Sequence, residues 1–177
     1  MADFSDIFLM QSRPFGEHWA QNYLLKTFKV FKDPHDYDKD FKNEYDILYP
    51  INGNIIKIEV KAARMVKPKK NDYESLLDRA ATTDEIGKIN DFGFFQIKNY
   101  CADVFILMCV FKNEIKYFVF SKKGIIDYGF YSNKQHRGNI GEGQINIRNI
   151  NFDAFFKLEV PKNNLIHEVI EAYKSNL

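Results

Sequence analysis

The sequence predicts an α/β fold in which a β-sheet is flanked by helices, and three observations support this prediction. Apolar and aromatic residues recur at helical spacing over about residues 15–30. A second amphipathic segment, residues 165–174, closes the chain as a helix. Between them lie several runs of β-branched and aromatic residues separated by short polar turns. At 177 residues and 45% hydrophobic content, the chain suits a single domain spanning residues 1–177.

The first element is the predicted helix at residues 15–30. Its apolar face carries Phe15, Trp19 and Tyr23, and its polar face carries Glu17 and Gln21, one turn apart. The Asp-rich segment that follows is interrupted by Pro34, so we expect a loop there.

The second unit, roughly residues 44–61, is predicted to be a β-hairpin. Its two apolar runs meet at Asn52-Gly53, a pair that tolerates the positive φ angles of a tight hairpin turn. Because side chains alternate along a strand, the second run has a core face and a polar face. The core face carries Ile56, Ile58 and Val60. The polar face carries Lys57, Glu59 and Lys61.

The rest of the chain alternates turns with short elements. A lysine-rich loop leads into a short helix around residues 73–80, for which Asn71 or Asp72 could serve as N-cap. Strands are then expected at residues 92–98, 103–111 and 115–121, followed by a long loop at 121–143. A short strand at 144–148 and a helical turn at 151–156 precede the closing helix.

Composition excludes several classes of protein. Cys101 and Cys109 make neither a disulfide framework nor a zinc-ligand spacing, so reduced thiols are expected. None of the histidines belongs to an HxH or HExxH pattern, and no Gly-x-Ser-x-Gly elbow occurs. The N-terminus lacks the features of a signal peptide, and no apolar run approaches membrane-spanning length. We therefore expect a soluble cytoplasmic protein.

Charge is distributed unevenly around the predicted hairpin, although the formal net charge is only +1. Residues 57–70 contain six basic residues against one acid, whereas residues 33–46 contain six acids against two lysines. An acidic block suits metal binding and a basic block suits phosphate binding, so the two together favour a nucleic-acid partner.

Within the hairpin, Asp46 is followed 13 residues later by Glu59-Val60-Lys61. This spacing resembles the PD-(D/E)xK nuclease superfamily, which contains most type II restriction endonucleases. Asp46 matches the first acid of the motif, Glu59 the second acid and Lys61 the lysine, whereas Tyr45 stands where the motif has Pro. Glu17 matches the glutamate that many members carry on an N-terminal helix.

The resemblance covers about residues 15–120 and implies a restriction-endonuclease-like core, a central mixed β-sheet flanked by helices. In that core a helix, a three-stranded antiparallel meander, a second helix and a further strand surround the active site. A weaker resemblance involves Gln96 and Tyr100, which have the Gln-x-x-x-Tyr spacing of the RecB-like branch. This resemblance makes Gln96 a possible neighbour of the active site.

The chemistry implied by the resemblance is hydrolysis of a phosphodiester with the help of Mg²⁺. Mg²⁺ prefers oxygen ligands and keeps several waters, so one or two carboxylates suffice to hold it. Asp46, Glu59 and Glu17 would bind the metal, and Lys61 could hold the attacking water or neutralise charge in the transition state.

Two segments offer side chains that could contact DNA. The first leaves the second hairpin strand and contains Arg64, Lys67, Lys69, Lys70 and Asn71. The second lies in the long loop and contains Lys134, Gln135, His136, Arg137 and Asn139.

The sequence thus predicts a Mg²⁺-dependent, sequence-specific endonuclease for double-stranded DNA, acting as a homodimer in the manner of a type II restriction enzyme. Two alternatives stay open. The same core could serve a repair or recombination nuclease such as a Holliday-junction resolvase, or a DNA-binding domain without turnover.

Overall fold

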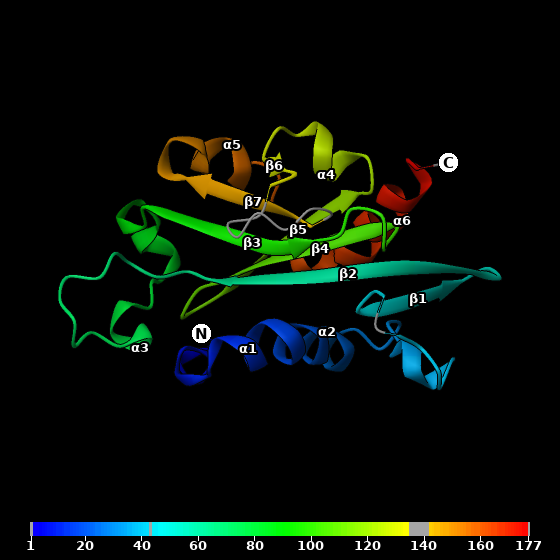
Figure 1. The fold of residues 1–177 in the computed structure, drawn as a ribbon, viewed down its shortest axis with the longest axis horizontal. Helices are drawn as coiled ribbons and strands as arrows, with labels where there is room; N and C mark the ends of the chain where they lie inside the picture. Colours follow the sequence, from blue (N-terminus) through cyan, green and yellow to red (C-terminus); the bar gives the residue numbers. More distant parts are fainter. Residues whose placement is uncertain (1, 43, 135–141, 177) are drawn as a thin grey trace.

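The computed structural model describes residues 2–42, 44–134 and 142–176, apart from the side chains of Arg13 and Glu17 (Figure 1). It is an α/β fold built on a mixed four-stranded sheet with the order β1-β2-β4-β5. Strands β1 and β2 are antiparallel, β2 and β4 are parallel, and β4 and β5 are antiparallel. The strands span Ile47–Ile51 (β1), Asn54–Arg64 (β2), Val104–Val110 (β4) and Ile115–Ser121 (β5).

A second sheet of three strands packs on the first, in the order β3-β7-β6. It consists of Asp91–Ile97 (β3), Gly143–Arg148 (β7) and Tyr131–Ser132 (β6). Strand β3 therefore pairs with β7 and does not extend the β1-β2 hairpin into the antiparallel meander that the resemblance implies. The neighbour of β2 on its other side is β4, which runs parallel to it.

The predicted hairpin is confirmed, including its turn. Asn52 and Gly53 have φ angles of 48° and 80°, the positive values that a two-residue hairpin turn requires. Ile47 pairs with Ile58 and Ile51 pairs with Asn54 on either side of that turn.

The N-terminal helix is continuous from residue 12 to residue 27 rather than from 15 to 30. It comprises Ser12–Pro14 (α1), a π-helical turn at Phe15–Trp19 (η2) and Ala20–Thr27 (α2). The helix ends early because Phe28 is extended, with φ −118° and ψ 96°. A 3₁₀ turn, Ser5–Leu9 (η1), precedes the helix, and another, Pro34–Asp36 (η3), interrupts the expected loop.

The helices of the second half are short, with one exception. The helix expected at residues 73–80 is limited to Leu76–Arg79 (α3), and its N-cap is Ser75, not Asn71 or Asp72. Ser75 and Asp78 form a reciprocal capping box, which the aspartate at N3 makes possible. The remaining helical elements are Thr83–Lys88 (η4), Gly124–Asp127 (α4), Asn149–Asn151 (η5), Phe152–Phe156 (α5), Lys162–Asn164 (η6) and Leu165–Lys174 (α6).

The core has two halves, one on each face of the four-stranded sheet. Strand β4 is buried along its whole length, as its almost wholly apolar sequence predicts, and its side chains alternate between the halves. Helices α2 and α6 cover one face, whereas β3, β7 and α5 cover the other (Figure 1). Since β2 lies in the middle of these layers, its core-facing residues Ile56, Ile58 and Val60 are buried as predicted.

Across the ranges that the structure describes, we find no helix with both the length and the apolar character needed to cross a lipid bilayer.

Candidate active site

Asp46 lies just before β1, and main-chain contacts fix its carboxylate beside β2. The Asp46 amide donates to the Ile58 carbonyl at 3.0 Å, which extends the hairpin ladder by one residue. Asp46 Oδ2 in turn accepts a hydrogen bond from the Val60 amide at 2.7 Å. The carboxylate of Asp46 therefore lies against the strand between Glu59 and Lys61, as the hairpin predicts.

Glu59 and Lys61 lie on the same face of β2 and form an ion pair. Lys61 Nζ is 2.5 Å from Glu59 Oε1, and the side chain of Glu59 is only 8% exposed. The other carboxylate oxygen, Glu59 Oε2, accepts a hydrogen bond from Cys101 Sγ at 3.6 Å. Glu59 is thus held from both sides, by an ammonium and by a thiol.

The three charged groups and Cys101 shift each other's protonation. Burial, and then the negative charge of Glu59, raises the pKa of Asp46 to about 6. Burial disfavours the Lys61 ammonium, but the carboxylates of Glu59 and Asp46 outweigh it and raise the pKa of Lys61. Burial, followed by the charge of Glu59, raises the pKa of the Cys101 thiol to about 12. The site therefore concentrates two carboxylates whose mutual repulsion one ammonium only partly relieves.

A cleft of about 1160 Å³ opens directly onto Asp46 and Lys61. The N-terminal helix forms one wall, and Gln21 on that helix donates from Nε2 to the main-chain oxygen of Asp46 at 2.6 Å. Gln21 lies on the predicted polar face one turn after Glu17, and no sequence pattern pointed to this contact. Through this contact the helix positions the start of the hairpin that carries Asp46.

Strand β3 forms another wall of the cleft, and its pairing with β7 is irregular near the end of the strand. The register between β3 and β7 shifts between Phe94 and Ile97, and Gln96 has a φ of 58°. Such bulges turn side chains away from the regular alternation. Gln96 and Phe95 line the cleft, whereas Tyr100, the other half of the Gln-x-x-x-Tyr spacing, is exposed and does not line it.

Glu17 lies in the π-helical turn η2, and its neighbours Gly16 and His18 line the cleft. Its side chain is outside what the structure describes, so its predicted contact with a metal stays a prediction. His18 and His35 also line the cleft, although the sequence offered no ligand pattern that pointed to either.

The donor set at the site suits Mg²⁺ bound through few protein ligands. In the described part of the chain, no group of three or more His, Cys, Asp or Glu side chains is arranged to hold a metal ion. Asp46 and Glu59 provide a pair of carboxylates, and Oδ1 of Asp46 makes no hydrogen bond to any described residue. Mg²⁺ commonly uses one or two carboxylates and completes its shell with waters and substrate phosphates, so the pair fits it.

Comparison with protein-family models, with curated proteins and with solved structures finds no match to this chain. Any function assigned to the chain therefore depends on the chemistry of these side chains and on the resemblance of Asp46, Glu59 and Lys61 to the PD-(D/E)xK pattern.

Arg64, the basic residue that ends β2, is engaged within the protein. Arg64 donates to the carbonyls of Ile7 and Met10 at 3.3 and 2.6 Å and to Ser12 Oγ at 3.1 Å, and its guanidinium lies over the Phe15 ring. Arg64 therefore holds the N-terminal segment against the end of β2, although it also lines the cleft.

The remaining predicted DNA contacts have varied surroundings. Lys67 pairs with Glu85 and Lys69 pairs with Asp72, whereas Lys70 and Asn71 are exposed. Lys134 is exposed as well. The other four candidates, Gln135, His136, Arg137 and Asn139, lie outside the described residues.

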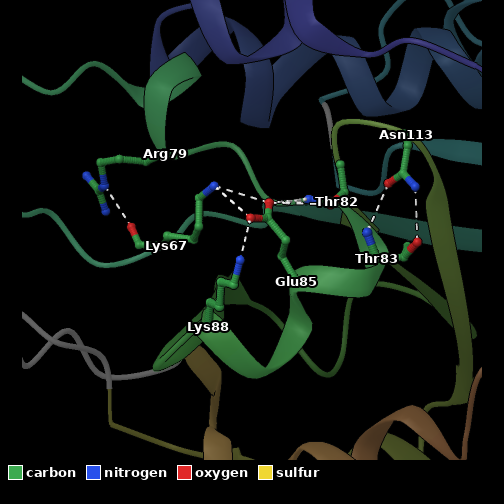
Figure 2. Close-up of polar contacts among 7 residues, drawn as sticks. All are labelled: Lys67, Arg79, Thr82, Thr83, Glu85, Lys88 and Asn113. Carbon is green, nitrogen blue, oxygen red and sulfur yellow. Dashed lines mark hydrogen bonds and ion pairs between the residues drawn. The ribbon is translucent and has the colours of Figure 1, made fainter.

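Glu85 is the centre of the network that engages Lys67 (Figure 2). It accepts from Lys67 Nζ at 3.1 and 3.2 Å, from Lys88 Nζ at 3.0 Å and from the Thr82 amide at 3.3 Å. Hydrogen bonds from Lys88 and Lys67 lower the pKa of Glu85 to about 2. Arg79 Nε donates to the Lys67 carbonyl at 2.8 Å, so the loop after β2 is tied to both α3 and η4.

Glu85→Gln is expected to lower the free energy of unfolding by about 1 kcal/mol at pH 7, a value reduced for solvent screening at this partly exposed position. Because the folded-state pKa lies below the unfolded one, the stabilisation is present above about pH 4 and is lost as pH falls towards 2. Urea unfolding at several pH values from 7 to 3 should show that the difference in free energy of unfolding between Glu85→Gln and wild type becomes smaller as pH falls. A difference that stays constant would contradict this assignment.

The matched control for this prediction is Asp84→Asn. Asp84 precedes Glu85 in the same turn, is exposed, and makes no side-chain hydrogen bond or ion pair within the described residues. Its substitution should change the free energy of unfolding by less than about 0.5 kcal/mol at either pH.

Proposed function

We propose that this protein is a Mg²⁺-dependent DNA endonuclease, and that its specific form is a type II restriction enzyme acting on double-stranded DNA. The observation that carries the proposal is the meeting of Asp46, Glu59 and Lys61 on one face of β2, with Asp46 and Lys61 open to a large cleft. The PD-(D/E)xK nucleases, which this arrangement resembles, cleave phosphodiesters with two carboxylates and a lysine.

The chemistry follows from the charges at the cleft. Asp46 and Glu59 would hold Mg²⁺, which supplies a more acidic water and neutralises phosphoryl oxygens. The Lys61 ammonium stays charged because both carboxylates raise its pKa, so it can donate to an oxygen of the phosphate or orient the water. Gln21 and the Val60 amide keep Asp46 in place, and Cys101 restrains the second oxygen of Glu59.

The acidic lining of the cleft also favours a metal-dependent reaction. Asp33 and Asp91 line it together with Asp46, while Lys61 and Arg64 are the basic side chains there and both are already paired or hydrogen-bonded. A phosphate entering this cleft needs additional positive charge, which bound Mg²⁺ would provide. A homodimer would present two such clefts, one for each strand of a duplex.

Asp46→Asn and Glu59→Gln are each expected to abolish DNA cleavage, because each removes a charged metal ligand while keeping the size of the side chain. The measurement is digestion of one sequenced plasmid with Mg²⁺, with the fragment ends read. Cleavage by wild type should disappear when a chelator is added. The control is Asp40→Asn, which removes an exposed carboxylate of the preceding loop and should leave cleavage unchanged.

The digest, together with cleavage of four-way junctions and a DNA-binding measurement, separates the forms of the proposal. Discrete fragments with a recurring end sequence support a restriction enzyme. Preferential cutting of four-way junctions over linear duplex would replace it with a junction resolvase. Tight DNA binding without cleavage under Mg²⁺ or Mn²⁺ would rule out the nuclease and favour a DNA-binding domain.

A further inference from the structure

The outer face of the second sheet carries a hollow that continues the cleft. This hollow, of about 350 Å³, extends from β3 onto Asn146 and Arg148 of β7. Cleft and hollow share four lining residues: Asp91, Phe92, Gly93 and Phe95. Cleft and hollow therefore adjoin along β3, and together they form a path from Asp46 and Lys61 to β7.

Gly93 and Phe95 shape the middle of this path. A Cβ at Gly93 would lie 2.6 Å from Asn146 Oδ1 and 2.8 Å from Cζ of Phe95. The side chains of Asn146 and Phe95 therefore meet over Gly93, where a residue with a side chain would not fit. Phe95 is 51% exposed although it stands at the cleft wall, immediately before the bulge at Gln96. Phe95 thus follows Asp91 and Gly93 on the outward face of β3 and presents its aromatic ring to the path.

Arg148 supplies a free positive charge at the far end of the path. It is exposed and lies opposite Asp91 in the β3-β7 register, yet neither side chain makes an ion pair or hydrogen bond with another described residue. This distinguishes Arg148 from Lys61, Arg64 and Lys67, whose charged groups are engaged inside the protein. An unengaged guanidinium beside an exposed ring and an amide is suited to a sugar–phosphate chain.

We propose that Phe95, Asn146 and Arg148 bind the sugar–phosphate backbone of a DNA duplex next to the phosphate that is cut at Lys61. Arg148 and Asn146 donate to phosphate oxygens and Phe95 packs on a deoxyribose, while the lack of a side chain at Gly93 lets Phe95 and Asn146 lie together. Asp91 opposes this binding, because its carboxylate faces the same phosphates. The inference rests on the proposed nuclease function and extends it by a substrate-binding surface.

The test measures binding of a fluorescein-labelled duplex by anisotropy, with Ca²⁺ replacing Mg²⁺. Arg148→Gln should weaken binding about fivefold and reduce the slope of log K against log salt by about one. Asp91→Asn should strengthen binding about two- to threefold, because it removes a repelling charge from the same surface. Phe95→Ser should weaken binding about threefold through lost apolar contact. The control, Lys122→Gln, removes an exposed lysine beside neither hollow and should bind as wild type does.

Opposite effects of Arg148→Gln and Asp91→Asn support the inference, because a loss of folding would weaken binding in both. Wild-type affinity in Arg148→Gln and Asp91→Asn would overturn it and leave the nuclease proposal intact. Wild type that cleaves no DNA under any metal would contradict the nuclease proposal. If the two variants still bind DNA with altered affinity in that case, the DNA-binding surface remains supported. Absence of any DNA binding by wild type would overturn both.

Discussion

Lys61→Ala is expected to reduce Mg²⁺-dependent DNA cleavage by about 10²- to 10³-fold, the usual cost of removing one donor from a developing charge. The lysine is held 2.5 Å from Glu59 and opens onto the cleft, so its ammonium is placed where a phosphate would lie. Without it, the carboxylates of Asp46 and Glu59 lose the positive charge that partly offsets their repulsion. Single-turnover cleavage of a plasmid measures the effect on the chemical step.

Lys57→Ala is the matched control for this prediction. Lys57 lies on the same strand and face as Lys61, but it is exposed and its ammonium lies over the Tyr45 ring, 5.5 Å from the centroid. Both variants remove one charge from β2, so a nonspecific electrostatic effect would appear in both. Equal cleavage by Lys61→Ala and wild type would contradict the assignment of Lys61 to the active site.

Phe155→Ala is expected to lower the free energy of unfolding by about 3–5 kcal/mol, the range observed when a buried Phe is truncated. Phe155 on α5 is fully buried, and its ring centroid lies 4.3 Å from that of Phe118 and 5.7 Å from that of Phe92. It therefore joins both sheets and α5 in a single aromatic cluster, which cannot collapse around the missing ring without moving a strand. Urea unfolding followed by far-UV circular dichroism gives the measurement.

The control for the core prediction is Tyr73→Ala. Tyr73 is also aromatic but is 96% exposed, so its removal should change the free energy of unfolding by less than about 0.5 kcal/mol. A loss below about 1 kcal/mol in Phe155→Ala would show that the second half of the core is loosely packed, contrary to its burial.

The features that sequence predicts well here are those encoded within a few residues. The Asn52-Gly53 turn fixes the hairpin, and the alternation from Ile56 to Lys61 separates the core-facing side chains from the face that carries Glu59 and Lys61. Both depend on local backbone preferences and on the two-residue period of a strand. The meeting of Asp46 with Glu59 and Lys61 follows from them directly.

Other features depend on partners distant in sequence, and local patterns gave no sign of them. The run of basic residues predicted a surface for phosphates, but Glu85, 18 residues after Lys67, engages that lysine, and Arg64 reaches back to Met10. The sheet to which β3 belongs could not be predicted either, because its sequence is that of an ordinary strand. Its pairing with β7 places it in the second sheet and not beside the hairpin. The N-cap at Ser75 is a different case, because its partner Asp78 is only three residues away and the prediction was wrong about where the helix begins.

The bonds of Arg64 have a mechanical consequence for the strand that carries the site. Strand β2 is fixed by the tight turn at Asn52-Gly53 at its start, by Arg64 and the N-terminal segment at its end, and by pairing with β1 and β4 along its length. A strand restrained in this way has little freedom to shift when a substrate arrives. Any adjustment to a ligand must therefore come from the walls of the cleft, while Glu59 and Lys61 keep a fixed spacing throughout.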